Sequence, residues 1–400
     1  MTPATRVHET RTPAAVLGSA RRIVVKVGSS LLVDRESNRL RADWLAALAS
    51  DISGLRDKGA EVVIVSSGAI ALGRRGLDLP PGVLRLEESQ AAAAAGQIEL
   101  ASAYRSALDN HGIRVAQILL TLSETEERRR HLNARATLRT LLDLGVVPVV
   151  NENDTVATNE IRFGDNDRLG ARVTQMISAD CLVLLSDIDG LYSADPRRDP
   201  AAEHIGLIER LTPEIEAMAG KVGPKTAYAM GSGGMQTKLI AARIAVGAGA
   251  HMIIADGRQS HPLGRLLAGA RASVFLAEAA PRTARKHWIA ASLSPAGHFV
   301  IDEGAVRALR RGMSLLPAGV VEVQGSFERG DAVRVLDRAG QEVGRGLTAY
   351  DSEDAGAIMG LKSRDIEDRL GYRGRDEMIH RDDLVVTAAD DTGARKDQDG

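Results

Sequence analysis

Short β-branched runs alternate with longer stretches rich in Ala, Leu and Arg between Arg21 and about Leu276. This alternation predicts a mostly parallel, open sheet sandwiched by helices, because parallel strands need a long crossover connection. Ligands of such sheets bind beyond the carboxyl ends of the strands. The expected strands cover Ile23 to Val27, Glu61 to Val65, Val115 to Leu119, Val146 to Val150, Cys181 to Leu185 and Met252 to Ile254, and the expected helices cover Arg41 to Lys58, Ser89 to His111, Ser123 to Asp143, Arg168 to Ala179 and Thr237 to Ala248.

The pattern changes after Pro281, where brief strand-like runs are separated by glycine-bearing turns, as in a small β domain. The strands expected there are His298 to Asp302, Gly319 to Val323, Ala332 to Leu336, Glu342 to Leu347 and Leu384 to Val386. We therefore expect a disordered leader over 1–20, an α/β domain over 21–279, a linker over 280–293, a small β-rich domain over 294–386 and a disordered tail over 387–400.

The composition excludes several classes of protein. The 400 residues are 44% hydrophobic, which is enough apolar material for the cores of two or three domains. A formal net charge of −2 and 3% aromatic residues argue against a general nucleic-acid binder, which needs a basic field and stacking rings. No apolar run approaches the about 18 residues that cross a bilayer, so we predict no membrane span. The single cysteine, Cys181, lies in an apolar run, so we expect it to be buried in a protein of a reducing compartment.

Lysine is scarce, and two lysines lie close to loops of small residues. Only eight of the 51 basic residues are lysines. The first strand runs into Lys26-Val27-Gly28-Ser29-Ser30, and a glycine-rich loop runs into a predicted helix at Gly233-Gly234-Met235-Gln236-Thr237-Lys238. Backbone N–H groups, a helix dipole and an ammonium group together favour phosphate binding. The alternative is that each lysine extends into solvent beside a flexible turn.

Three polar clusters follow the second and fourth predicted strands. They are Ser66-Ser67-Gly68, Asn151-Glu152-Asn153-Asp154 and Gly164-Asp165-Asn166-Asp167. Such clusters suit a zwitterion, because a carboxylate binds an ammonium group and N–H donors bind a carboxylate. The alternative is that they only form Asx turns and helix N-caps.

A fourth polar segment, Ser186-Asp187-Ile188-Asp189-Gly190, leaves the predicted strand that contains Cys181. Asp187 and Asp189 have no His or Cys at ligand spacing, so no tightly held transition metal is predicted. The sequence contains neither a P-loop pattern nor G-x-G-x-x-G after a strand, which argues against both of those nucleotide folds.

Taken in order, these motifs resemble the amino-acid-kinase family. The resemblance spans about Arg21 to Leu276, and the segment after it resembles the PUA domain that some bacterial members append. It implies the amino-acid-kinase fold followed by a PUA-like domain. The segments that carry it are Lys26 to Ser30, Ser67 to Ile70, Asn151 to Asp154, Gly164 to Asp167, Ser186 to Tyr192 and Gly233 to Lys238.

The resemblance implies ATP-dependent phosphorylation, with Mg²⁺, of the γ-carboxylate of L-glutamate to L-glutamyl 5-phosphate, the first step of proline biosynthesis. By resemblance, Lys26, Lys238 and Asp167 are catalytic. The positions that match ATP-binding residues are Lys26, Gly28, Ser186, Asp187, Ser232, Gly233, Gly234, Met235, Gln236, Thr237 and Lys238. Those that match substrate-binding residues are Ser67, Gly68, Asn151, Asp154 and Asn166, and no residue is assigned as a metal ligand.

The sequence leaves two alternatives open. Another member of the family would use aspartate or acetylglutamate as the acceptor, and the PUA-like domain would give a role in RNA binding. Acidic residues such as Asp302, Glu303 and Glu328 dilute the positive field of Arg307, Arg310 and Arg311, which argues against RNA as a partner. The resemblance further suggests a cytoplasmic homo-oligomer that hands its acyl phosphate to a glutamyl phosphate reductase.

Overall fold

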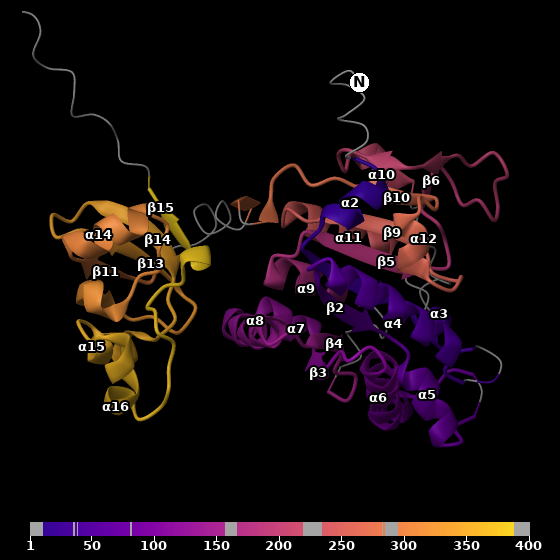
Figure 1. Ribbon diagram of the computed structural model, residues 1–400, viewed down its shortest axis with the longest axis horizontal. Coiled ribbons are helices and arrows are strands. Elements are labelled where there is room, and N and C mark those ends of the chain that lie inside the picture. The colour runs from indigo at the N-terminus through magenta and orange to yellow at the C-terminus, as the bar shows by residue number, and fades with distance from the viewer. Residues whose placement is uncertain are drawn as a thin grey trace, which may run out of the picture. The chain divides into compact units, whose positions relative to one another are not determined.

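The computed structural model describes residues 11–34, 37, 39–80, 82–156, 166–218, 234–281, 283–284 and 295–387. The chain divides into two compact units, Met1–Pro281 and Arg282–Gly400 (Figure 1). The predicted linker lies mostly outside the described residues, as does all but the first residue of the predicted tail.

An eight-stranded sheet forms the centre of the first unit, with the strand order β3-β4-β2-β1-β5-β9-β10-β8. The six strands from β3 to β9 are parallel to their neighbours, whereas β10 runs antiparallel to β9. The mostly parallel α/β sheet predicted from the sequence is therefore confirmed. The strands are β1 (Arg22–Val27), β2 (Glu61–Ser66), β3 (Val115–Leu120), β4 (Val147–Glu152), β5 (Cys181–Ser186), β8 (Leu207–Ile208), β9 (His251–Asp256) and β10 (Ala272–Phe275), and a separate hairpin contains β6 (Leu191–Tyr192) and β7 (His204–Ile205).

Helices cover both faces of this sheet and bury a separate hydrophobic core on each. The first core includes side chains of α2 (Pro13–Ser19), α3 (Ser29–Leu32), α4 (Ala42–Asp57), α5 (Ala69–Gly76), α6 (Leu86–Asp109) and α12 (Pro262–Leu267). The second includes side chains of α7 (Leu122–Glu126), α8 (Arg128–Asp143), α9 (Asn166–Ile177) and α11 (Met235–Gly247), with α10 (Pro213–Ala217) at its margin.

The alternation of side chains along β1 decides which face Lys26 meets. Ile23, Val25 and Val27 belong to the first core, whereas Val24 belongs to the second. Because side chains two residues apart share a face of a strand, Lys26 points with Val24 toward α9 and α11. The sheet order also makes β1 and β5 the pair at which the chain turns from one side of the sheet to the other, which is where ligands of such folds bind.

Several details differ from the sequence prediction. The expected helix from Ser123 to Asp143 is two helices that meet at Glu127. The strands β8 and β10 were not expected, because four or fewer apolar residues carry little periodicity. The prediction of a disordered leader is wrong for Pro13–Ser19, which forms a helix capped by Thr12 and buries Leu17 in the first core. Residues 1–10 lie outside the described part of the chain.

Helices α5 and α6 pack unusually close together through two glycines. A Cβ added to Gly73 would lie 1.8 Å from the carbonyl oxygen of Ala92, and one added to Gly96 would lie 1.9 Å from that of Ala69. Any other residue at these positions would force the two backbones apart. The pair of glycines therefore fixes the position of α6 against α5.

The second unit contains a five-stranded sheet with the order β12-β11-β13-β14-β15, so the predicted β-rich domain is confirmed. Phe299 and Phe327 meet edge to face in its core, with ring centroids 5.6 Å apart. Its helices were not predicted, because each is short. The elements are β11 (Gly297–Ile301), α14 (Glu303–Arg310), β12 (Val320–Gly325), β13 (Ala332–Leu336), β14 (Glu342–Leu347), α15 (Ser352–Ile358), α16 (Ile366–Leu370) and β15 (Leu384–Val386).

Candidate active site

One buried carboxylate lies between two lysines at the carboxyl end of β1. Lys26 Nζ is 2.7 Å from Asp167 Oδ1, and Lys238 Nζ is 3.0 Å from Asp167 Oδ2. The three residues come from β1, the first turn of α9 and the first turn of α11, and they are 7%, 1% and 5% exposed for Lys26, Asp167 and Lys238. The structure therefore brings together all three residues that the resemblance marks as catalytic.

The charges of this cluster decide the protonation state of Asp167. Burial alone would raise the pKa of its carboxyl group, but the ammonium groups of Lys26 and Lys238 outweigh burial and hold the pKa well below its usual range. Asp167 is thus ionised at neutral pH and fixes the two ammonium groups about one carboxylate. A net positive charge remains, and it suits an anion such as a phosphate.

The N-terminus of α11 adds further polar groups beside this cluster. Gly234 is the N-cap of the helix, and the hydroxyl of Thr237 lies 3.2 Å from Asp167 Oδ2 and 2.9 Å from the carbonyl oxygen of Gly234. A helix N-terminus carries partial positive charge. Met235 and Gln236, also predicted to bind ATP, occupy the first turn of the same helix, whereas Ser232 and Gly233 lie outside the described residues.

A second cluster, built of amides and hydroxyls, begins one residue before Asp167. The side-chain Nδ2 of Asn166 donates to the carbonyl oxygen of Ser66 at 2.9 Å, to Ser67 Oγ at 2.7 Å and to Asn151 Oδ1 at 3.2 Å. Within the part of the chain that the structure describes, the buried Oδ1 of Asn166 accepts no hydrogen bond. A buried acceptor without a donor costs free energy, so this oxygen is suited to an incoming N–H group.

Asp154 is a further buried carboxylate close to the end of β4. Burial raises its pKa to about 6, and no described cation offsets this shift. A carboxylate in such a setting gains from pairing with a cationic ligand. Together with Asn166 Oδ1, it gives the second cluster two acceptor groups for an ammonium ion.

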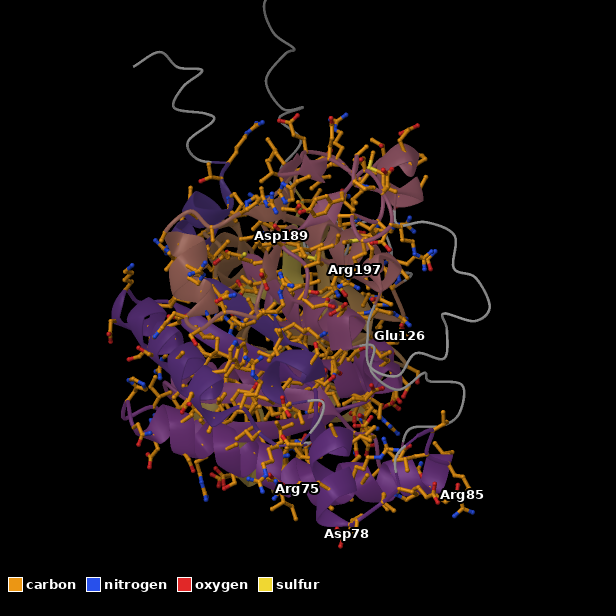
Figure 2. All side chains as sticks on the ribbon, turned by 90° about the vertical axis from the view of Figure 1, so that its right-hand side faces the viewer. Arg75, Asp78, Arg85, Glu126, Asp189 and Arg197 are labelled. Atoms are coloured by element: carbon orange, nitrogen blue, oxygen red, sulfur yellow. The ribbon has the colours of Figure 1, made fainter. Side chains whose placement is uncertain are left out.

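The predicted nucleotide residues Ser186 and Asp187 are the last residue of β5 and the first residue of the loop that follows it. Ser186 Oγ donates to Asp187 Oδ1 at 3.2 Å, and Arg197 Nη2 donates to Asp187 Oδ2 at 2.9 Å. Burial would raise the pKa of Asp187, but Arg197 outweighs it and the pKa is lowered. In Figure 2, Arg197 and Asp189 lie in the upper part of the first unit, whereas Arg75 of α5 lies near its lower edge.

The two predicted site glycines, Gly68 and Gly28, differ in whether their backbone conformation requires glycine. Gly68 has φ +110° at the N-cap of α5, a conformation that residues other than glycine rarely adopt. Gly28 has an ordinary extended conformation, and a Cβ there would lie 3.8 Å from Lys26 Nζ. Glycine at that position leaves the ammonium group of Lys26 uncovered on this side.

The comparison with known families decides the classification. The profile of the amino acid kinase family matches residues 21–256, and that of the PUA domain matches residues 297–370. The chain belongs to the amino acid kinase family. Its first unit is thus an amino acid kinase domain, and its second unit contains a PUA domain.

Similar curated proteins agree with this family. A protein named glutamate 5-kinase from Paramagnetospirillum magneticum is 60% identical over 370 residues, which cover 92% of this chain and 99% of that protein. Glutamate 5-kinase 1 from Rhizobium meliloti is 58% identical over 95% of both chains. Among solved structures, carbamate kinase from Giardia lamblia matches 65% of this chain and all of its own with 16% identity and a TM-score of 0.46.

Some polar residues around the kinase site gave no signal in the sequence. Gln97 accepts a hydrogen bond from Asn151 Nδ2 at 2.7 Å, and Tyr104 OH lies 3.0 Å from Ser66 Oγ. Both lie on α6, where Gln97 follows a run of five alanines and Gly96, and Tyr104 follows Ala103, so neither belongs to one of the polar motifs. Arg197 lies in the hairpin loop after β6. Only the folded chain shows that these side chains reach the site.

Cys181 is fully buried, as predicted, and burial raises the pKa of its thiol. Within the described ranges, no three His, Cys, Asp or Glu side chains are grouped as a metal site. None of the described helices combines the length and the apolar character needed to cross a bilayer.

Proposed function

We propose that this amino acid kinase transfers the γ-phosphoryl group of ATP to the side-chain carboxylate of L-glutamate. The observation that carries the proposal is the contact of two adjacent residues with two different clusters. Asp167 holds Lys26 and Lys238, which suit phosphates, and Asn166 holds Ser67 and Asn151, which suit an amino acid. The likeness to proteins named glutamate 5-kinase over more than nine tenths of the chain supports glutamate as that amino acid.

The chemistry needs little beyond positioning and charge. The γ-carboxylate of glutamate, with an ordinary pKa of about 4.3, is ionised at neutral pH, so its oxygen attacks the γ-phosphorus without a general base. The bond from the γ-phosphorus to the bridging oxygen breaks, and ADP leaves. We assign Lys26 and Lys238 to the negative charge that spreads over the phosphoryl oxygens, and Asp167 to holding the two ammonium groups in place.

We further propose that ATP binds between the loop after β5 and the N-terminus of α11. Asp187 lies at the first of these and Thr237 at the second. Mg²⁺ enters with ATP as part of the nucleotide substrate. It usually keeps several waters and phosphate oxygens as ligands, so it does not require a cage of protein carboxylates.

The α-ammonium group of glutamate is assigned to Asp154 and Asn166 Oδ1. Asp154 is the buried carboxylate whose pKa is raised, and Asn166 Oδ1 is the acceptor without a donor among the described residues. Each gains a partner when an ammonium group binds. Ser67 and the N–H groups near Gly68 are assigned to the carboxylates of the substrate.

The raised pKa of Asp154 predicts how glutamate binding depends on pH. With a pKa of about 6 in the free protein, Asp154 is ionised at pH 8 and mostly protonated at pH 5. Only the ionised form pairs with an ammonium group, so KM for glutamate is expected to rise about tenfold from pH 8 to pH 5. The γ-carboxylate of glutamate stays mostly ionised over this range, so its own titration does not cause the rise.

Asp154→Asn separates this carboxylate from other titrating groups. The variant is expected to have a high KM for glutamate at pH 8 that changes little down to pH 5. If Asp154→Asn keeps the wild-type pH dependence, another group causes it and the assignment of Asp154 is wrong.

The product of the proposed reaction can be trapped directly. An acyl phosphate reacts with hydroxylamine to give a hydroxamate, so ATP, Mg²⁺ and L-glutamate are expected to yield ADP and hydroxamate in equal amounts. Formation of ADP without hydroxamate would mean that the acceptor is water or another group, and the proposed reaction would be wrong.

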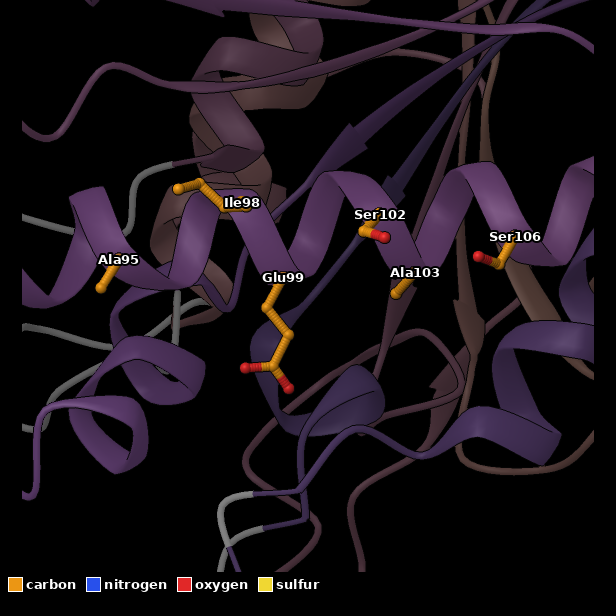
Figure 3. A pocket seen from close by; sticks show the side chains of 6 residues that line it. All are labelled: Ala95, Ile98, Glu99, Ser102, Ala103 and Ser106. Atoms are coloured by element: carbon orange, nitrogen blue, oxygen red, sulfur yellow. The ribbon is translucent and has the colours of Figure 1, made fainter.

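The remaining proposals concern the localisation, the oligomeric state and the partner of the enzyme. We propose that it works in the cytoplasm as a homo-oligomer and passes its unstable acyl phosphate to a reductase. On the outer face of α6, Ile98 is 76% exposed and lies on one surface with Ala95, Glu99 and Ser102 (Figure 3), and we propose this surface as a contact between subunits. Sedimentation of the full chain tests the oligomer, and a monomer at micromolar concentration would contradict it.

A further inference from the structure

A polar side chain of α6 reaches the amide cluster from outside the predicted site. Gln97 Oε1 accepts a hydrogen bond of 2.7 Å from Asn151 Nδ2. Asn151 is 1% exposed, so its amide cannot exchange this partner for bulk water. Gln97 therefore determines which end of the Asn151 amide faces α6 and which end faces Asn166.

The two hydrogen bonds are donated in the same direction, from Asn166 to Asn151 and from Asn151 to Gln97. Because Asn151 donates to Gln97 through Nδ2, its Oδ1 faces Asn166 and accepts from Asn166 Nδ2 at 3.2 Å. Asn166 Nδ2 also donates a hydrogen bond to Ser67 Oγ at 2.7 Å. With Nδ2 surrounded by acceptors, the Oδ1 of Asn166 is the end left for a ligand. A rotated Asn151 amide would place its NH₂ group against that of Asn166 and break this order.

The position of Gln97 is itself fixed by packing. Gly96, the preceding residue, is the glycine at which α6 approaches α5 too closely for a side chain. Two turns further along α6, Tyr104 is fully buried and its hydroxyl lies 3.0 Å from Ser66 Oγ. The helix is thus held to α5 at Gly96 and to the sheet at Tyr104, and the acceptor oxygen of Gln97 between them has little freedom to move.

We infer that Gln97 is a positioning residue for the amino-acid substrate, acting through Asn151 and Asn166. Its oxygen holds the two amides in the orientation that presents Asn166 Oδ1 to the substrate ammonium group. This inference rests on the proposed function, since it takes that ammonium group to be the one on L-glutamate. It assigns no contact between Gln97 and the phosphates.

The variants Gln97→Leu and Gln97→Met remove the acceptor and keep most of the volume, and Gln97→Glu keeps an acceptor oxygen. Loss of a buried hydrogen-bond partner is expected to raise KM for glutamate about tenfold in Gln97→Leu and Gln97→Met. KM for ATP and kcat are expected to change less than threefold, because Lys26 and Lys238 are untouched. Gln97→Glu is expected to restore KM for glutamate to within threefold of wild type.

The full-length protein is the material for each assay, and Glu99→Gln is the control. Glu99 lies two residues away on the outer face of α6 (Figure 3), so its replacement is expected to change neither KM. Thermal melting of every variant shows whether α6 still packs. If the Leu variant melts early, the Met variant, with a flexible chain of similar length, decides the question.

The outcomes separate the two proposals. Wild-type protein that forms no hydroxamate with L-glutamate would overturn the proposed function and this inference with it. An active wild type together with an unchanged KM for glutamate in Gln97→Leu and Gln97→Met would overturn only the role of Gln97. The same holds if Gln97→Glu fails to restore KM, or if the Leu and Met variants lose glutamate binding, ATP binding and kcat together, since both results indicate a merely structural role.

Discussion

Lys238→Ala is expected to lower kcat by about 10²- to 10³-fold, as loss of one preorganised charge donor typically does. Lys238 Nζ is held 3.0 Å from Asp167 Oδ2 in a site where Lys238 itself is 5% exposed. An ammonium group about 4 Å from a phosphate oxygen contributes on the order of 4 kcal/mol at an effective dielectric near 20. Water that replaces the ammonium group would have to reorganise as charge moves in the transition state. The variant is therefore expected to lose kcat and not affinity for the substrates.

Steady-state kinetics of the full-length protein, with coupled detection of ADP, measure this change. KM for glutamate is expected to stay within a few fold of wild type, because Asn166 and Asp154 are not altered. Lys58→Ala is the matched control, since Lys58 lies exposed just after α4. Turnover close to wild type in Lys238→Ala would show that this lysine does not act on the transferred group.

Asp167→Asn is expected to impair both stability and turnover, because it leaves two buried ammonium groups without their carboxylate. Asp167 contacts Lys26 and Lys238 at 2.7 and 3.0 Å and is 1% exposed. Removing one partner of a buried ion pair typically costs about 3–5 kcal/mol. For a domain of this size, that corresponds to a Tm lower by very roughly 6–20 °C. The exposed residue Asp109 provides the control variant Asp109→Asn.

The difference in stability between wild type and Asp167→Asn depends on pH, and the direction of the pKa shift of Asp167 determines how. The folded-state pKa of Asp167 lies well below its ordinary value, so its ionised form contributes stability above about pH 4. That contribution is lost as the pH falls through the folded-state pKa. In chemical unfolding, the free energy of unfolding of wild type is therefore expected to exceed that of Asp167→Asn by a constant amount near neutral pH. This difference is expected to become smaller in acid. Equal stability at pH 7 would contradict the charge cluster.

Much of the site could be predicted from the sequence, because each of its segments ends a strand or begins a helix. The position of Lys26 follows from the alternation along β1, and Asn166 and Asp167 begin a recognisable helix. The roles of these residues in catalysis and binding stay predictions, whereas their proximity is a property of the fold. Cys181 was expected in a buried strand for the same reason of local pattern.

The parts that could not be predicted depend on contacts between distant segments. Gln97 and Asn151 lie 54 residues apart, and the position of Gln97 depends on the close packing of α5 and α6 at Gly96. The antiparallel β10 has too few residues to carry a periodic pattern. The helix Pro13–Ser19 was not predicted, because its two buried residues stabilise it only by packing against the rest of the kinase unit.

The choice of acceptor tests the proposed function most directly. Purified full-length protein would be assayed with ATP, Mg²⁺ and hydroxylamine against L-glutamate, L-aspartate and N-acetyl-L-glutamate. L-Aspartate lacks one methylene group, which typically costs 10- to 200-fold, and N-acetyl-L-glutamate has no ammonium group for Asp154. We expect kcat/KM for L-glutamate to exceed both by at least about tenfold. An equal or higher kcat/KM for either rival would contradict a glutamate kinase.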